Sequence, residues 1–226
     1  MKFKAVVVDI DGTITCEKRE LHLGAVEKLR SLKLPVVLAT GNIICYARAA
    51  SKLIGLSGAV IAENGGAVTV QYDAPASFAN GVEECKKAFD YLSAHFELTQ
   101  LDPFYRKTEI ALRRNFDTEK AKELLKALDL DIEIVDTKYA IHIKSRKVNK
   151  GTGLVKLARL MGLEPADFVA IGDSMNDVEM LKVAGFGIAV ANGDEKIIKA
   201  ADYVTKAAFG AGTVEALEFL EAKGWI

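Results

Sequence analysis

Asp9 follows directly on the apolar run Ala5–Val8, Asp11 lies two residues further on, and Gly12 comes next. Three of the four residues in this run are β-branched, which is typical of a strand buried on both faces. Two carboxylates at the end of such a strand repel each other unless a cation lies between them. The stretch therefore predicts a site for a hard divalent cation, with Mg²⁺ as the expected ion. A polar turn after a core strand would have the same composition.

Two further polar clusters share this placement, and a lysine stands at the start of a predicted helix. Thr40-Gly41-Asn42 follows one apolar run, Asp173 and Asp177 follow another, and Lys150 opens a predicted helix. In open α/β sheets, ligands bind outside the carboxyl ends of the strands, so we expect the clusters to converge on one edge of a sheet. Carboxylates, a hydroxyl, backbone N–H groups and a lysine together can hold a phosphate and Mg²⁺.

The elements that must position these residues form an α/β pattern. Segments with the apolar spacing of a helix lie between the apolar runs. One such segment carries Leu23, Val26, Leu29 and Leu32, and we expect Pro35 to end this helix. Strands, helices and strands in alternation predict βαβ units, hence a Rossmann-like parallel sheet with helices on both faces. The predicted strands are Ala5–Val8, Val36–Ala39, Ala59–Ala62, Phe168–Ile171, Gly187–Val190 and Tyr203–Val204.

The pattern changes in the middle of the chain. Two predicted helices, Val82–Ala94 and Asp117–Leu128, alternate with two pairs of short strands. Such pairs suit an antiparallel sheet covered on one face by the helices. The sequence thus predicts a core domain over 1–80 and 150–226, with an inserted α+β cap domain over 81–149.

Composition excludes several classes of protein. The chain has 226 residues and a formal net charge of −1, which gives no support for a nucleic-acid partner. No apolar run approaches the roughly 18 residues that span a bilayer. Cys16, Cys45 and Cys85 form no CxxC pair, so neither a disulfide framework nor a zinc site is indicated. A reducing cytoplasm is the expected location. The oligomeric state is open, with a homodimer among the alternatives.

Together the three clusters and Lys150 resemble the haloacid dehalogenase superfamily of phosphotransferases. Asp9-Ile10-Asp11-Gly12-Thr13 matches its DxDx[TV] motif, and Thr40 matches the Ser or Thr of its second motif. Lys150 matches the third motif, and the run from Gly172 to Asp177 matches the fourth. The motifs occur in the family's order, and the insert resembles the family's large α/β cap, which the resemblance implies selects the substrate.

The resemblance also implies roles. Asp9 would be the nucleophile that forms an aspartyl-phosphate, and Asp11 the general acid and then the base for the attacking water. An acid at position 11 points to ester hydrolysis or phosphomutation within the superfamily. The metal would be Mg²⁺, and the residues implied to bind it are Asp9, Asp11 through its main-chain carbonyl, Asp173 and Asp177. The residues implied to hold the phosphoryl group are Thr40, Gly41, Asn42 and Lys150. Asn176 and Asn192 are candidates for supporting these groups.

Chain length, the compact insert and the run Glu63-Asn64-Gly65-Gly66 are most similar to archaeal-type phosphoglycolate phosphatases. The resemblance implies hydrolysis of 2-phosphoglycolate, a small phosphorylated metabolite, to glycolate and phosphate. A sugar-phosphate phosphatase or a phosphomutase of the same superfamily is the alternative. A non-catalytic regulator that binds sugar phosphates is a third hypothesis, against which the intact Asp9 and Asp11 argue.

Basic residues of the insert are expected mainly on solvated surfaces. His142 alternates with Ile141 and Ile143, which predicts that it lies on a solvated sheet face, with a substrate-facing position as the alternative. The same expectation holds for most members of a group of basic residues, although one cation facing a substrate carboxylate would suit a small phosphorylated acid. The members of that group are Arg106, Lys107, Arg113 and Arg114.

Overall fold

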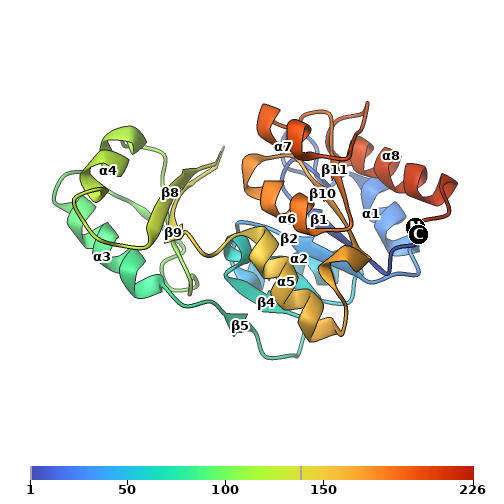
Figure 1. Cartoon of the computed structure of the whole chain (residues 1–226), viewed down its shortest axis with the longest axis horizontal. Helices are drawn as coiled ribbons and strands as arrows, with labels where there is room; N and C mark the ends of the chain where they lie inside the picture. The colour runs from blue at the N-terminus through green and yellow to red at the C-terminus, as the bar shows by residue number, and fades with distance from the viewer. Residues whose placement is uncertain (1, 138) are drawn as a thin grey trace. The chain divides into compact units, whose positions relative to one another are not determined.

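The computed structural model describes residues 2–137 and 139–226, which divide into two compact units. The core unit comprises Met1–Ser77 and Asn149–Ile226, and the inserted unit comprises Phe78–Val148. The sequence-based boundaries for the insert were 81 and 149, against 78 and 148 in the structure. Figure 1 shows the inserted unit in green to yellow.

The core unit is built on a mostly parallel sheet in the order β12-β11-β10-β1-β2-β3-β4-β5. β1 lies at its centre and pairs in parallel with both β10 and β2, whereas β4 runs antiparallel to β3. This confirms the predicted α/β class. The strands are β1 Ala5–Asp9, β2 Val36–Ala39, β3 Val60–Ala62, β4 Ala67–Thr69, β5 Ser77–Phe78, β10 Phe168–Gly172, β11 Phe186–Ala189 and β12 Tyr203–Val204.

Both faces of this sheet are covered. Alternate residues of β1 face opposite layers: Val6 and Val8 pack in one apolar cluster with α1, α2 and α8, and Ala5 and Val7 pack in another with α5 and α6 (Figure 1). Burial on both faces explains why β1 is a continuous apolar run without alternation. The helices are α1 Leu23–Ser31, α2 Ile44–Ile54, α5 Lys150–Met161, α6 Val178–Val183, α7 Glu195–Ala200 and α8 Phe209–Ala222.

Two local details differ from the sequence-based expectation. α1 ends at Ser31, before Pro35 is reached, because Leu32 already adopts an extended conformation and its N–H bonds to the carbonyl of Leu29. The six-residue helix α7 was not predicted, since it is too short to show helical periodicity. Asp194 caps it by accepting from the N–H groups of Lys196 and Ile197.

The inserted unit has its own antiparallel sheet, in the order β6-β7-β9-β8, and its own core. Cys85 and Leu92 of one helix pack against Leu112, Ile141 and Ile143 of the sheet. Its elements are α3 Val82–Ser93, β6 Gln100–Leu101, β7 Ile110–Leu112, α4 Thr118–Leu125, β8 Ile132–Asp136 and β9 Ile141–Ser145. The sequence predicted these elements in this order, although the observed β6 and β7 are shorter than the predicted strands.

A bilayer-spanning segment is not found in the described part of the chain, where every helix is too short or too polar for that purpose.

Candidate active site

The core sheet brings the predicted polar clusters to one edge. The register of β1 sets Asp9 opposite Ala39 of β2 and Val8 opposite Ile171 of β10. Because these strands are parallel, the residues that follow them emerge on the same side. Asp9, Thr40 and Asp173 therefore leave neighbouring strands at the same edge of the sheet.

Lys150 reaches this edge from the first residue of α5. Its Nζ lies 2.6 Å from Oδ1 of Asp9 and 2.5 Å from Oδ1 of Asp177, and its side chain is 1% exposed. A capping box starts the helix, because Asn149 Oδ1 accepts from Thr152 N–H while Thr152 Oγ1 accepts from Asn149 N–H. The cap determines the position of the first helical residue, and hence the point from which the ammonium group extends.

The charges at this edge do not balance. Carboxylate oxygens of Asp9, Asp173 and Asp177 all lie within 4.8 Å of one another, and all three residues are buried. Burial raises the pKa of Asp9 well above its usual range, the charges of Asp177 and Asp173 add to this, and Lys150 offsets only part of it. Burial alone would lower the pKa of Lys150, but Asp177 and Asp9 raise it overall. The Lys150 ammonium thus contacts two carboxyl groups of this cluster, and the carboxyl group of Asp173 lies beside them.

The donor set suits a hard divalent cation. Carboxylate oxygens are the ligands that Mg²⁺ and Ca²⁺ prefer, and a second positive group would relieve the repulsion that burial strengthens. The Gly12 backbone packs directly against this cluster. A side chain at position 12 would clash with it, since a Cβ would lie 2.3 Å from Oδ2 of Asp173. Asn192 links the two residues, because its Nδ2 donates to the Gly12 carbonyl at 2.9 Å and to Asp173 Oδ2 at 3.4 Å. Asp9, Asp173 and Asp177 are thus the residues that could hold a metal.

Thr40, Gly41 and Asn42 form a loop between β2 and α2. The hydroxyl of Thr40 is buried and accepts from the N–H of Asn42 at 3.0 Å, while Asn42 Oδ1 accepts from Ile43 N–H at 2.8 Å. These bonds hold the loop at the start of a helix, where N–H groups and the helix dipole favour an anion. A phosphoryl group held by this loop stays a prediction.

Asp11 lies apart from the buried cluster. Its Oδ1 accepts a hydrogen bond from Nε of Arg19 at 2.9 Å, and Arg19 is itself partly exposed. Among the described residues, Asp11 does not belong to the group of carboxylates that could share a metal. Arg19 was not among the predicted site residues, because nothing in the local sequence around it marks it as a partner of Asp11. The Thr13 hydroxyl was not predicted to have a role either, and it donates to Asp9 Oδ2 at 3.2 Å.

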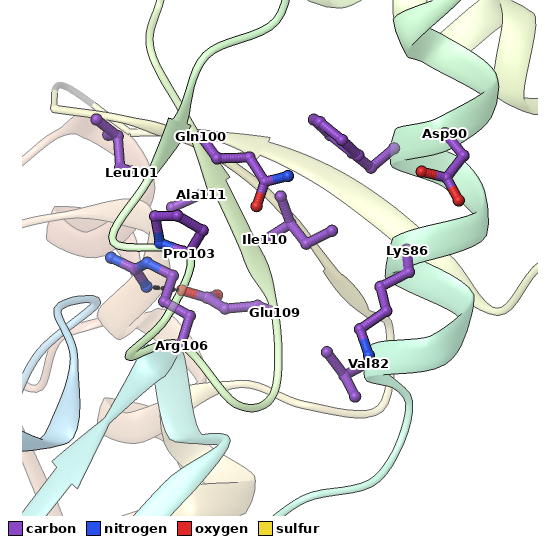
Figure 2. A pocket seen from close by; sticks show the side chains of 11 residues that line it. Val82, Lys86, Asp90, Gln100, Leu101, Pro103, Arg106, Glu109, Ile110 and Ala111 are labelled. Carbon is purple, nitrogen blue, oxygen red and sulfur yellow. Dashed lines mark hydrogen bonds and ion pairs between the residues drawn. The ribbon is translucent and has the colours of Figure 1, made fainter.

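The inserted unit holds a cavity of its own, of about 290 Å³, between α3 and the β6–β7 pair. Figure 2 shows Lys86 and Asp90 of α3 on one side of it, and Gln100 and Ile110 on the other. None of the predicted catalytic or metal-binding residues lines this cavity.

Two predictions for the inserted unit were wrong. His142 is buried, at 4% exposed, and its Nδ1 lies 2.9 Å from Oε1 of Glu109. Arg106 is also withdrawn from solvent and pairs with the same oxygen of Glu109. The acid just before β7 thus provides a buried partner for both groups, which the alternation along one strand could not indicate. The expectation of solvated positions is confirmed for Lys107, Arg113 and Arg114.

Comparison with protein families and known proteins agrees with this geometry. A family described as haloacid dehalogenase-like hydrolase matches residues 6–123 and 86–217. A protein of Methanosarcina acetivorans named phosphoglycolate phosphatase is 71% identical over 226 residues, covering 100% of both chains. A protein of the same name from Methanosarcina mazei is 70% identical over the same length and coverage.

The fold has relatives among solved structures. A crystal structure of a Thermoplasma acidophilum protein superimposes with a TM-score of 0.88, covering 98% of this chain and 99% of that one, at 23% sequence identity. At this level of identity the likeness concerns the fold, and it extends over both units of the chain.

Proposed function

The chain belongs to the haloacid dehalogenase-like hydrolase family, and from this premise we propose that it is a Mg²⁺-dependent phosphatase that hydrolyses 2-phosphoglycolate to glycolate and phosphate. The observation that carries the proposal is the buried contact between Lys150 and Asp9 beside two further carboxylates. A carboxylate held against a lysine and a cation site can approach a phosphate dianion, which would otherwise repel it.

Asp9 is the proposed nucleophile. One of its carboxylate oxygens forms a bond to phosphorus as the bond to the leaving oxygen breaks, which gives an aspartyl-phosphate and an alkoxide. Each oxygen of the Asp9 carboxylate accepts one hydrogen bond: Oδ2 from the Thr13 hydroxyl at 3.2 Å, and Oδ1 from the Lys150 ammonium at 2.6 Å. This restraint keeps Asp9 in one orientation, and orientation is a main source of rate in phosphoryl transfer.

Asp11 is the proposed general acid. It donates a proton to the leaving alkoxide, then accepts one from the water that attacks the aspartyl-phosphate and releases inorganic phosphate. Because Oδ1 of Asp11 accepts a hydrogen bond from Arg19 Nε, we propose that Oδ2 carries the proton that is donated to the leaving group. The position of Asp11 outside the buried carboxylate cluster supports a role separate from metal binding through its side chain.

The proposed metal is Mg²⁺, held by the carboxylates of Asp9, Asp173 and Asp177. When bound it would neutralise charge on the phosphoryl group. Asp177 also accepts from the N–H groups of Asp173 and Ser174, at 3.3 and 3.2 Å, and these bonds shape the loop that presents Asp173. The loop Thr40–Asn42 is proposed to hold the phosphoryl oxygens.

Phosphoglycolate is the proposed substrate because full-length relatives at 71 and 70% identity bear the name phosphoglycolate phosphatase. The inserted unit is proposed to select it, since the core residues gathered at this edge are groups suited to phosphate and metal. Replacing residues 78–148 by the insert of a sugar-phosphate phosphatase should change the ranking of substrates while the requirement for Mg²⁺ stays.

The deciding experiment measures phosphate release by the full chain from 2-phosphoglycolate and a panel of sugar phosphates, with Mg²⁺ and with EDTA. We expect the highest kcat/KM for 2-phosphoglycolate, and none of this activity in EDTA. Asp9→Asn should lower kcat by more than about 10³-fold, and retained activity would remove Asp9 as the nucleophile. Reaction in ¹⁸O-water should place one label in each released phosphate, whereas a phosphomutase would return the phosphoryl group to a product.

A further inference from the structure

A strained turn lies beside the candidate active site. The residues Glu63–Gly65 form one turn of 3₁₀ helix between β3 and β4, and Glu63 and Asn64 adopt positive φ values of 48° and 52°. Both side chains are buried. Such a backbone costs roughly 1–2 kcal/mol at each non-glycine residue, and it persists only where its surroundings impose it.

The backbone of this turn holds the loop proposed to bind phosphate. Glu63 N–H donates to the Asn42 carbonyl at 2.8 Å, and Asn64 N–H donates to the Thr40 carbonyl at 3.2 Å. The two bonds attach both ends of the loop Thr40–Asn42 to the turn. A displacement of the turn would therefore move the Thr40 hydroxyl.

The Asn64 side chain connects this loop to the metal-site loop. Its Oδ1 accepts from Nδ2 of Asn176 at 3.1 Å, and it packs against Gly41, where a Cβ would lie only 2.9 Å from that oxygen. Asn176 in turn accepts from the Ser174 hydroxyl at 2.5 Å, and the same hydroxyl lies 3.2 Å from Asp177 Oδ2. Side-chain contacts thus run from Asn64 through Asn176 and Ser174 to the carboxylate that contacts Lys150, with the single Ser174 proton shared between its two acceptors.

The third contact of the turn is with the helix that carries Lys150. A Cβ on Gly65 would lie 1.9 Å from the carbonyl oxygen of Asn149, and a Cβ on Gly153 would lie 2.7 Å from Gly65 Cα. The turn is therefore in direct contact with the first residues of α5. It touches all three segments that supply the proposed phosphate and charge-balancing groups.

We propose that Asn64 is a positioning residue for phosphoryl transfer, whose side-chain amide sets the Thr40–Asn42 loop against the Asp173–Asp177 loop. The inference rests on the proposed phosphatase function. Glycine at position 64 would adopt the positive φ without steric cost, so the amide is the feature that glycine cannot replace. Asn64 acts through its neighbours and needs no contact with the substrate.

The test is a double-mutant cycle with Asn64→Gly and Asn176→Ala. Asn64→Gly should lower kcat for 2-phosphoglycolate by about 10- to 100-fold, with a smaller change in KM and no loss of melting temperature beyond a few degrees. The double variant should be no slower than the slower single variant, because both changes break one connection. Wild-type kcat in Asn64→Gly, or losses in kcat that multiply, would overturn the proposal.

A readout without turnover keeps this test separate from the proposed function. Hydrogen–deuterium exchange of the amides of residues 40–44 should be faster in Asn64→Gly than in the wild-type chain, and unchanged exchange would contradict the inference even if no ester were hydrolysed. Asp102→Gly is the matched control, since Asp102 also has a positive φ, of 53°, but lies in the inserted unit. It measures the stability gained from glycine at such a site and should leave exchange at 40–44 unchanged.

Discussion

Lys150 Nζ lies 2.6 Å from Asp9 Oδ1, although the two residues are 141 positions apart in the chain. The same nitrogen contacts Asp177, so one cation separates two buried carboxylates that would otherwise repel each other. A charge in this position stabilises the folded core and at the same time holds the proposed nucleophile. Changes at Lys150 should therefore alter both stability and activity.

Lys150→Met is expected to destabilise the metal-free chain by about 3–5 kcal/mol at neutral pH, because it leaves two buried carboxylates without their cation. It should also abolish phosphatase activity. Urea unfolding in EDTA measures the first effect. Lys182→Met is the control: Lys182 is about half exposed in its pair with Glu179, and its loss should cost less than about 1 kcal/mol. Equal unfolding free energies for the two variants would contradict the buried pairing.

Asp9→Asn should be inactive and yet at least as stable as the wild-type chain in EDTA at neutral pH. The pKa of Asp9 is raised in the folded state, chiefly by burial, so its ionisation works against folding. The neutral Asp9 side chain stabilises the folded chain fully when the pH is below the pKa of Asp9 in the unfolded chain, about 3.9. This stabilisation is lost as the pH rises through the pKa of Asp9 in the folded chain.

The stability of Asp9→Asn relative to wild type should therefore increase with pH above about 4. Urea unfolding of both chains at a series of pH values, in EDTA, measures this difference. If the wild-type chain gained stability over the variant as pH rose, the electrostatic account of Asp9 would be wrong.

Mg²⁺ should stabilise the folded chain by mass action, by about 2.7 kcal/mol at a free concentration one hundred times its dissociation constant. Asp173→Asn should remove most of this gain, since it takes away one of three clustered carboxylates. Thermal melting with and without Mg²⁺ measures both effects.

Asp117→Asn is the matched control for this prediction. Asp117 caps α4 in the inserted unit, and asparagine caps a helix equally well, so the response to Mg²⁺ should persist. Loss of the response in both variants would argue against a site at Asp173.

The cysteines should differ sharply in reactivity. Burial, together with the nearby charges of Glu109 and Glu84, raises the pKa of Cys85 to about 12, whereas Cys45 is exposed. Because the thiolate is the reactive form, iodoacetamide at pH about 8 should label Cys45 and leave Cys85 unmodified in the folded chain. Peptide mass spectrometry before and after urea unfolding measures this, and labelling of folded Cys85 would contradict its burial.

Several features could be predicted from local sequence. Val6 to Val8 form a strand because β-branched residues without alternation suit a sheet covered on both faces, and the repeat of such runs predicted the parallel order. The family followed from motif residues at strand ends, since chemistry at this edge of an α/β sheet requires particular side chains in a particular chain order. The comparisons confirm the family and the fold class.

Other features depended on contacts between distant segments. Burial of His142 requires Glu109, which lies 33 positions away, and alternation along one strand carries no information about such a partner. The link from Asn64 to Asn176 spans 112 positions, and the run Glu63-Asn64-Gly65-Gly66, which contributed to the family resemblance, does not indicate this partner. Local sequence therefore determined which elements form and which side chains stand at their ends. Tertiary structure alone decided which of those side chains meet, because hydrogen bonds and charge pairing depend on distances that only packing sets.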